Sequence, residues 1–146
     1  MISDEMLFRL LMRTDACLRR QRVPEASEEA LRHPGFGSVL DALEKLGPSS
    51  QRQLVVLTRL RQPTVSESLR LMAEEGLVSR RTDESDARST VLELTEKGRE
   101  LQRQLKLQRK KLAQRVFSGI SEEEKQMLYT ILRKMEYTIT EGDEQE

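Results

Sequence analysis

Residue types that would indicate a catalytic or disulfide-linked protein are scarce in this chain of 146 residues. A single cysteine excludes a disulfide framework within the chain, and a single histidine leaves no histidine pair for a metal. Three phenylalanines, two tyrosines and no tryptophan argue against a platform that stacks single-stranded bases. The glycines at 35–37 lack the third glycine of a dinucleotide-binding loop, and residues 47–50 lack the lysine of a phosphate loop. We therefore expect no enzyme activity, no metal and no cofactor.

Long apolar runs and excess charge are also missing. No apolar run reaches the length of a transmembrane helix, and the acidic N-terminus lacks a signal-peptide pattern, so we expect a cytoplasmic protein with no membrane partner. The 25 basic and 25 acidic residues balance. Their distribution is uneven, because residues 52–70 are arginine-rich, residues 101–121 are basic and residues 141–146 are acidic. A phosphate backbone responds to local charge, although the basic run at 101–121 is more typical of a solvated helix face.

Residues 49–94 carry an unbroken series of structural signals. Ser50 and Gln53 have the spacing of a capping box that begins a helix, and Pro63 suits the first turn of a second helix. Gly76 is expected to end that second helix. Its apolar face holds Val65, Leu69 and Met72 at helical spacing. Two short helices joined by about four residues predict a helix-turn-helix.

The pattern then changes from helix to strand. Residues 77–82 and 89–94 are rich in β-branched residues, and the polar residues 83–88 between them have the length of a hairpin loop. A helix-turn-helix followed directly by a β-hairpin predicts a winged helix.

Three short motifs lie in the same region. They are Glu74-Glu75-Gly76-Leu77-Val78-x-Arg80, Asp86-x-Arg88 and Leu94-Thr95-x-x-Gly98. Over residues 36–101 the chain resembles the multiple-antibiotic-resistance regulator (MarR) family. The resemblance implies a dimeric winged-helix transcription regulator, usually a repressor that small molecules or oxidants release from DNA. It also implies that Asp86 and Arg88 pair with each other and that Arg88 reaches the minor groove. Thr58 departs from the family, which usually has a buried leucine there.

Further helices are predicted on both sides of this region. They cover residues 3–20, 36–46, 95–117 and 121–140, with one additional turn near 28–32. The 36–46 helix carries Val39, Leu40, Leu43 and Leu46, and the last helix carries Leu128, Ile131, Leu132, Met135 and Ile139. Such apolar faces need a partner, and a second copy of the chain is the simplest one. The alternative is a monomeric bundle packed beside the winged helix.

The expected fold class is therefore mainly α, an α+β winged helix, in one domain that spans residues 1–146. Residues 1–35 and 100–140 would form dimerisation helices, residues 36–99 the winged helix-turn-helix lobe, and residues 141–146 an acidic, disordered tail.

The candidate DNA contacts share exposed positions on the two short helices and the wing. They are Ser50, Arg52, Arg61, Gln62, Thr64, Ser66, Glu67, Arg70, Arg80, Arg81, Asp86 and Arg88. Arginine and glutamine can read guanine and adenine edges, and Ser50 and Arg52 at a helix start suit phosphate. Glu67 could accept from cytosine or orient Arg70, and the second role is favoured. Each arginine could instead be an ordinary surface residue, an alternative strongest for Arg81 and weakest for Arg88.

These observations lead to the hypothesis of a homodimeric repressor that binds double-stranded DNA at a pseudo-palindromic operator. Two recognition helices would meet half-sites about 34 Å apart. A small-molecule effector in a cleft between the dimer helices and the lobe would release the DNA. One alternative is a winged-helix protein-interaction module without DNA binding. Another is a redox sensor based on Cys17, although the position of Cys17 on an apolar stripe favours a buried structural cysteine.

Overall fold

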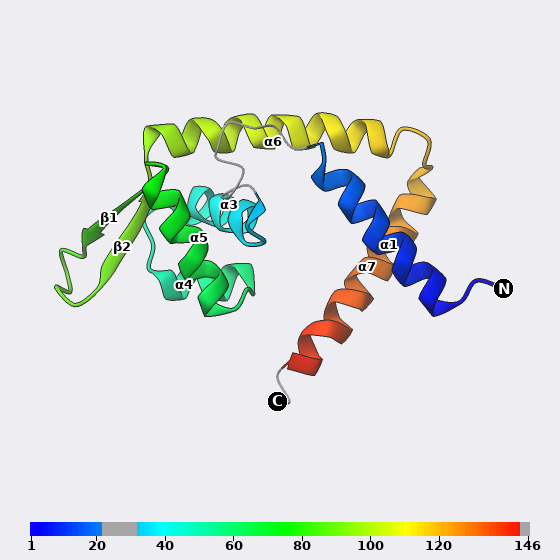
Figure 1. The fold of residues 1–146 in the computed structure, drawn as a ribbon, viewed down its shortest axis with the longest axis horizontal. Coiled ribbons are helices and arrows are strands. Elements are labelled where there is room, and N and C mark those ends of the chain that lie inside the picture. The colour runs from blue at the N-terminus through cyan, green and yellow to red at the C-terminus, as the bar shows by residue number, and fades with distance from the viewer. Residues whose placement is uncertain (22–31, 144–146) are drawn as a thin grey trace. The chain divides into compact units, whose positions relative to one another are not determined.

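The computed structural model describes residues 1–21 and 32–143, and its elements carry the labels of Figure 1. They are helices α1 (Asp4–Arg19), α3 (Phe36–Leu46), α4 (Gln51–Thr58) and α5 (Gln62–Glu74), strands β1 (Val78–Thr82) and β2 (Thr90–Leu94), and helices α6 (Glu96–Val116) and α7 (Glu122–Asp143). The mainly helical winged-helix fold predicted from the sequence is confirmed. The turn expected near residues 28–32 falls almost entirely outside the described residues. Two compact units, Met1–Gln108 and Arg109–Glu146, make up the chain.

The hydrophobic core of the first unit lies where α3, α4 and α5 pack against one another and against the hairpin. The predicted apolar faces are confirmed by the burial of Val39, Leu40, Leu43, Val65, Leu69 and Met72. Leu46 is an exception, because it lies in the last turn of α3, beyond the core, and is exposed. The prediction that Leu46 shares the buried face is therefore wrong.

The turn between α4 and α5 is organised by Thr58 and Arg59. The Thr58 hydroxyl donates to the Leu54 carbonyl (2.7 Å) and accepts the Leu60 N–H (3.4 Å). Arg59 adopts the left-handed conformation (φ 55°), and its N–H donates to the Val55 carbonyl at the end of α4. Leu60 packs against the core. The threonine at position 58 thus stabilises the turn by hydrogen bonding rather than by burying a leucine.

The wing is an antiparallel hairpin that pairs Val78 with Leu94 at one end and Thr82 with Thr90 at the other. A third segment bonds to the free edge of β2. The Ser49 N–H donates to the Leu92 carbonyl (3.0 Å), and the Leu92 N–H donates to the Ser49 carbonyl (2.8 Å). These two bonds fasten the wing to the segment that leads into α4, so the hairpin and the helix-turn-helix are joined within one lobe.

Helix α6 begins at a close-packed joint with the wing. The Thr95 hydroxyl donates to the Gly76 carbonyl (2.6 Å) and accepts the Gly98 N–H (3.1 Å), which confirms Thr95 as the helix cap. A Cβ at position 98 would lie 2.1 Å from the Leu77 carbonyl oxygen. Only glycine therefore allows the helix to approach the wing this closely.

Helix α1 begins at a Ser3 cap and contains no buried residue. Its apolar side chains are exposed, and so is Cys17. The favoured prediction of a buried Cys17 is wrong for the single chain, because the described residues do not cover that face of α1.

Helix α7 begins with the predicted capping box. The Ser121 N–H donates to the Glu124 carboxylate (2.8 Å), and the Glu124 N–H donates to the Ser121 hydroxyl (3.2 Å). The apolar stripe of α7 is largely solvent-exposed, with Ile131 48% and Ile139 65% accessible. The helix continues to Asp143, since no proline interrupts it. The prediction that the disordered tail begins at residue 141 is therefore wrong for residues 141–143.

Across residues 1–21 and 32–143, no helix is both long and apolar enough to span a membrane.

Candidate nucleic-acid interface

Helix α5 turns its polar face to solvent because its apolar face is buried in the core. Arg61, Gln62, Ser66 and Arg70 are exposed, and Thr64 and Glu67 are half-buried. Arg61 occupies the N-cap position without a side-chain cap bond, and Pro63 lies in the first turn. The start of α5 therefore offers Arg61 and Gln62 for base edges or phosphates, as the sequence predicts.

Arg70 is held by two carboxylates on its own helix. Its Nε donates to Glu67 Oε2 (2.9 Å), its Nη2 donates to Glu67 Oε1 (2.6 Å), and its Nη1 pairs with Glu74. The hydrogen bond from Arg70 lowers the pKa of the Glu67 carboxyl, and the same bond raises the pKa of the Arg70 guanidinium. In the free chain Glu67 therefore orients Arg70, which is the role that the sequence favours.

The start of α4 forms the predicted capping box. The Ser50 hydroxyl accepts the Gln53 N–H (3.2 Å), while the Gln53 side chain accepts the Ser50 N–H (2.8 Å). The cap thus engages the Ser50 hydroxyl, and any phosphate contact would fall more readily on Arg52. The Arg52 side chain is exposed and forms no hydrogen bond or ion pair within the described part of the chain. The first amides of α4 also lack intrahelical acceptors, as at any helix start.

The loop of the wing is stabilised by two aspartates. Asp83 accepts the N–H (3.0 Å) and the hydroxyl (2.9 Å) of Ser85, and these hydrogen bonds lower the pKa of its carboxyl. Asp86 accepts the backbone N–H of Arg88 (3.0 Å) and the hydroxyl of Ser89 (3.0 Å). A preformed loop holds the wing tip in place before any partner arrives.

The pairing expected between the side chains of Asp86 and Arg88 is not found. The Asp86 carboxylate bonds to the main chain of Arg88 because the tight turn brings that N–H within reach. The Arg88 guanidinium is exposed and unpaired among the residues that the structure describes. It is therefore free to contact a phosphate or a groove.

Two further arginines lie on β1. Arg80 stands opposite Leu92 and Arg81 opposite Val91 in the hairpin register. Arg81 lies 3.9 Å from the Glu93 carboxylate, whereas Arg80 has no such partner in the described ranges. The difference agrees with the sequence argument that Arg81 is the weaker candidate.

Sequence reasoning missed a contact behind the recognition helix. Ser68 is fully buried on α5, and its hydroxyl lies 2.7 Å from Nδ1 of the half-buried His33. The Gly35 N–H also donates to this nitrogen (3.3 Å). A Cβ at Gly35 would lie 2.7 Å from the Ser68 hydroxyl, so the loop before α3 packs tightly on α5. The sequence signal was a serine within the apolar stripe, which alone does not identify its partner.

No cluster of three or more His, Cys, Asp or Glu side chains suited to a metal occurs in residues 1–21 and 32–143. The predicted residues lie on α4, α5 and the wing of one lobe, and most of them are exposed. Such a surface can bind a polyanion.

A family model described as the MarR family matches residues 37–89 of the chain. Among solved structures, BpsR of Bordetella bronchiseptica is 25% identical, with a TM-score of 0.71, and the match covers 90% of this chain and 96% of BpsR. That structure concerns the regulation of BpsR DNA binding by 6-hydroxynicotinic acid.

Two other solved structures share the fold. PcaV of Streptomyces coelicolor, solved with its natural ligand, is 22% identical with a TM-score of 0.75, and the match covers 90% of each chain. MepR of S. aureus, solved as a DNA complex, is 23% identical with a TM-score of 0.71, and the match covers 94% of this chain and 97% of MepR.

Proposed function

Because the chain belongs to the MarR family of winged-helix, DNA-binding transcription regulators, we propose that it is a homodimeric, sequence-specific repressor that a small molecule releases from its operator. Proteins of this family are regulators rather than enzymes. The proposal covers four properties: repression, the residues that contact DNA, the homodimer, and release from the operator by a small molecule.

The observation that carries the DNA contacts is the contrast between two sets of arginines. On α6, Arg99 pairs with Glu96, and Arg103 pairs with Glu100 and Glu96. On α4, α5 and the wing, Arg70 and Arg81 are ion-paired, but four other arginines are exposed without a side-chain partner among the described residues: Arg52, Arg61, Arg80 and Arg88. Unpaired guanidinium groups on one lobe are suited to phosphate oxygens, which would release counterions from DNA.

We assign distinct roles to the elements of this surface. Helix α5 would enter the major groove, where Gln62, Thr64, Ser66 and Arg70 reach base edges. The start of α4, with Ser50 and Arg52, would contact the phosphate backbone. The wing would place Arg88 in or beside the minor groove, with Arg80 and Arg81 near the backbone and Asp86 holding the loop.

The dimer proposal rests on the exposed apolar faces of α1 and α7. Large apolar patches of this kind are uncommon on monomeric proteins and usually mark an interface. The exposed apolar faces of α1 and α7, which fall within the predicted ranges 1–35 and 100–140, would supply the interface, so that each operator half-site meets one lobe.

Release by a small molecule is supported by BpsR, whose DNA binding is regulated by 6-hydroxynicotinic acid. A ligand that binds more tightly to a DNA-incompetent state would shift the population away from the operator-bound form.

The test is binding of the full chain to a duplex from upstream of its own gene, over a series of salt concentrations. We expect saturable binding that survives excess unrelated DNA and weakens steeply as salt rises. The double variant Arg70→Ala/Arg88→Ala should lose at least about tenfold in affinity while remaining dimeric. Arg99→Ala is the matched control, because Arg99 is similarly exposed and ion-paired but lies on α6, outside residues 100–140. Equal, weak binding to every duplex would favour a protein-interaction module instead.

The exposed Cys17 thiol favours one second candidate, a regulator that responds to oxidants. In that case peroxide would release the wild-type chain from the duplex, and Cys17→Ser would remain bound. Release of the Cys17→Ser variant by peroxide would exclude this role for the thiol.

A further inference from the structure

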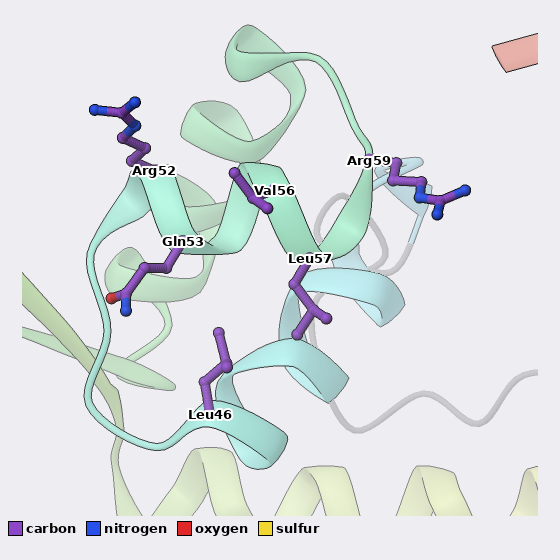
Figure 2. Close-up of a pocket in the computed structure, with 6 residues that line it drawn as sticks. All are labelled: Leu46, Arg52, Gln53, Val56, Leu57 and Arg59. Carbon is purple, nitrogen blue, oxygen red and sulfur yellow. The ribbon is translucent and has the colours of Figure 1, made fainter. Parts of the chain in front are cut away.

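A shallow groove on the DNA-binding lobe shares only Arg52 with the proposed DNA contacts. It lies between the last turn of α3 and the outer face of α4, and it encloses about 510 Å³. Its lining consists of Leu46, Arg52, Gln53, Val56, Leu57 and Arg59. Figure 2 shows Val56 and Leu57 between the two arginines, with Leu46 on the neighbouring end of α3.

The floor of the groove is apolar although the lobe does not need it for its core. Val56 is 72% exposed, Leu46 41% and Leu57 38%. On the opposite side of α4, Leu54 is fully buried and already joins the helix to α3 and α5. The described part of the chain thus leaves these three apolar side chains uncovered.

The two ends of the groove are positively charged. Arg52 and Arg59 are both exposed, and neither forms an ion pair or hydrogen bond through its side chain within residues 1–21 and 32–143. Arg52 lies in the first turn of α4 and Arg59 is its C-cap. The two residues are seven positions apart, so the rise of the backbone between them is about 10 Å, or two helical turns. Arg59 also adopts a left-handed backbone, a conformation that non-glycine residues rarely occupy. The groove thus has an apolar centre and a cation at each end.

We infer that this groove binds an acidic, amphipathic helix of another protein. Two carboxylates seven positions apart on such a helix would meet Arg52 and Arg59. Apolar side chains between them would cover Leu46, Val56 and Leu57, in the manner of a helix laid into a hydrophobic groove. The partner helix and the DNA backbone would then compete for Arg52, while Arg59 and the apolar floor would belong to the partner alone.

Other occupants fit less well. A second copy of the same surface would bring arginines against arginines. DNA has no apolar face to cover Val56. A small carboxylate would leave much of its own surface in water, because small-molecule pockets usually bury most of their ligand and this floor is open.

The test uses the methyl-labelled full chain and a synthetic helical peptide. The peptide carries two glutamates seven positions apart, with two leucines between them on the same face. In the control peptide, lysines replace the glutamates. We expect the glutamate peptide to shift the methyl NMR signals of Leu46, Val56 and Leu57 in a saturable way, and the lysine peptide to leave them unchanged.

Variants connect the signals to the groove. Arg59→Asn removes one charge but tolerates the left-handed backbone, and it should weaken peptide binding about two- to fivefold. Val56→Asp should weaken binding by more than about tenfold, as expected for a central apolar anchor. Lys45→Gln removes an exposed charge outside the groove and should leave peptide affinity unchanged. Neither groove variant alters a proposed DNA contact, so duplex affinity should remain within about twofold of wild type.

Several results would overturn the inference. Equal binding of both peptides would remove the role of the arginines, and an absence of methyl shifts with folded protein would remove the site. Shifts caused by octanoate but not by the peptide would identify a small-molecule site. Concentration-dependent shifts without peptide, abolished by Val56→Asp, would identify self-association.

Discussion

Arg70 carries its two carboxylate partners on its own helix, so any contact that it makes with DNA must compete with Glu67 and Glu74. The Glu67 pKa lies below its ordinary value of 4.5. The ion pair is therefore complete above that ordinary value and is lost as the pH falls through the lower folded-state pKa. At neutral pH the pair is intact, and it restrains Arg70 at the surface where DNA is proposed to bind.

Replacing Glu67 with Gln should release Arg70 and remove a negative charge from the DNA-facing surface. We expect tighter binding to the operator and to unrelated duplexes, because the change favours phosphate contact whatever the sequence. If Arg70 gains one phosphate contact, the slope of log K against log salt should steepen by about 0.9. Fluorescence anisotropy over a salt series measures both quantities. A loss of affinity confined to one operator base pair would instead show that Glu67 reads a cytosine.

Thr58 permits a second prediction at this scale. Thr58→Val keeps the shape of the side chain but removes the hydroxyl that bonds to Leu54 and Leu60. We expect a loss of about 1 kcal/mol in the free energy of unfolding. Thr130→Val on α7 is the matched control, since Thr130 makes a similar bond to the carbonyl four residues earlier but is exposed, lies away from the apolar stripe and joins no turn. Equal losses in the two variants, measured by urea denaturation, would contradict a special role for Thr58 in the turn.

At the scale of elements, the joint between the wing and α6 depends on close backbone approach. Gly98→Ala would place a methyl group against the Leu77 carbonyl and should cost about 1–3 kcal/mol or more. Gly37→Ala is the comparison, because no atom lies within 4 Å of a Cβ built there and alanine is the better helix former. We expect Gly37→Ala to stabilise the fold by up to about 1 kcal/mol. Chemical denaturation of the two variants should therefore move in opposite directions.

The elements themselves were predictable because burial of one face imposes a period on the sequence. The orientation of α5 follows from the burial of Val65, Leu69 and Met72. Because these side chains face the core, Gln62 and Arg70 on the other side of the helix face solvent. Capping boxes at Ser50 and Ser121 located two helix starts, because their partners lie only three residues away.

Interactions between distant residues were not predictable in the same way. Ser68 is polar yet buried because its hydroxyl meets His33, which lies 35 positions away in sequence. Leu46 continues an apolar period past the point where the core ends, so periodicity alone could not place it. For the candidate DNA contacts, the sequence named positions that are mostly exposed, but it did not reveal that Asp86 bonds to a backbone amide rather than to the Arg88 side chain.

At the scale of the whole molecule, the exposed stripe of α7 leads to a prediction about assembly. Ile131→Glu would place a charge in the proposed dimer interface and should convert the dimer to monomer or unfold it. Gln126→Glu adds the same charge on the opposite side of the helix and should leave the dimer intact. Sedimentation velocity distinguishes the two states, and circular dichroism reports whether the variant is folded. A folded Ile131→Glu dimer would exclude this face as the interface.

The bridge between Ser49 and Leu92 has a consequence for aggregation. An exposed strand edge is a template on which other chains can add strands. One edge of β2 is paired with β1, and the middle of the other edge is already bonded to Ser49. The remaining free edge belongs to β1, where the charged side chains of Arg80 and Arg81 discourage a neutral strand from docking. The segment that leads into α4 thus also blocks the outer edge of β2, so that a strand of another chain cannot pair with it and extend the wing into an intermolecular sheet.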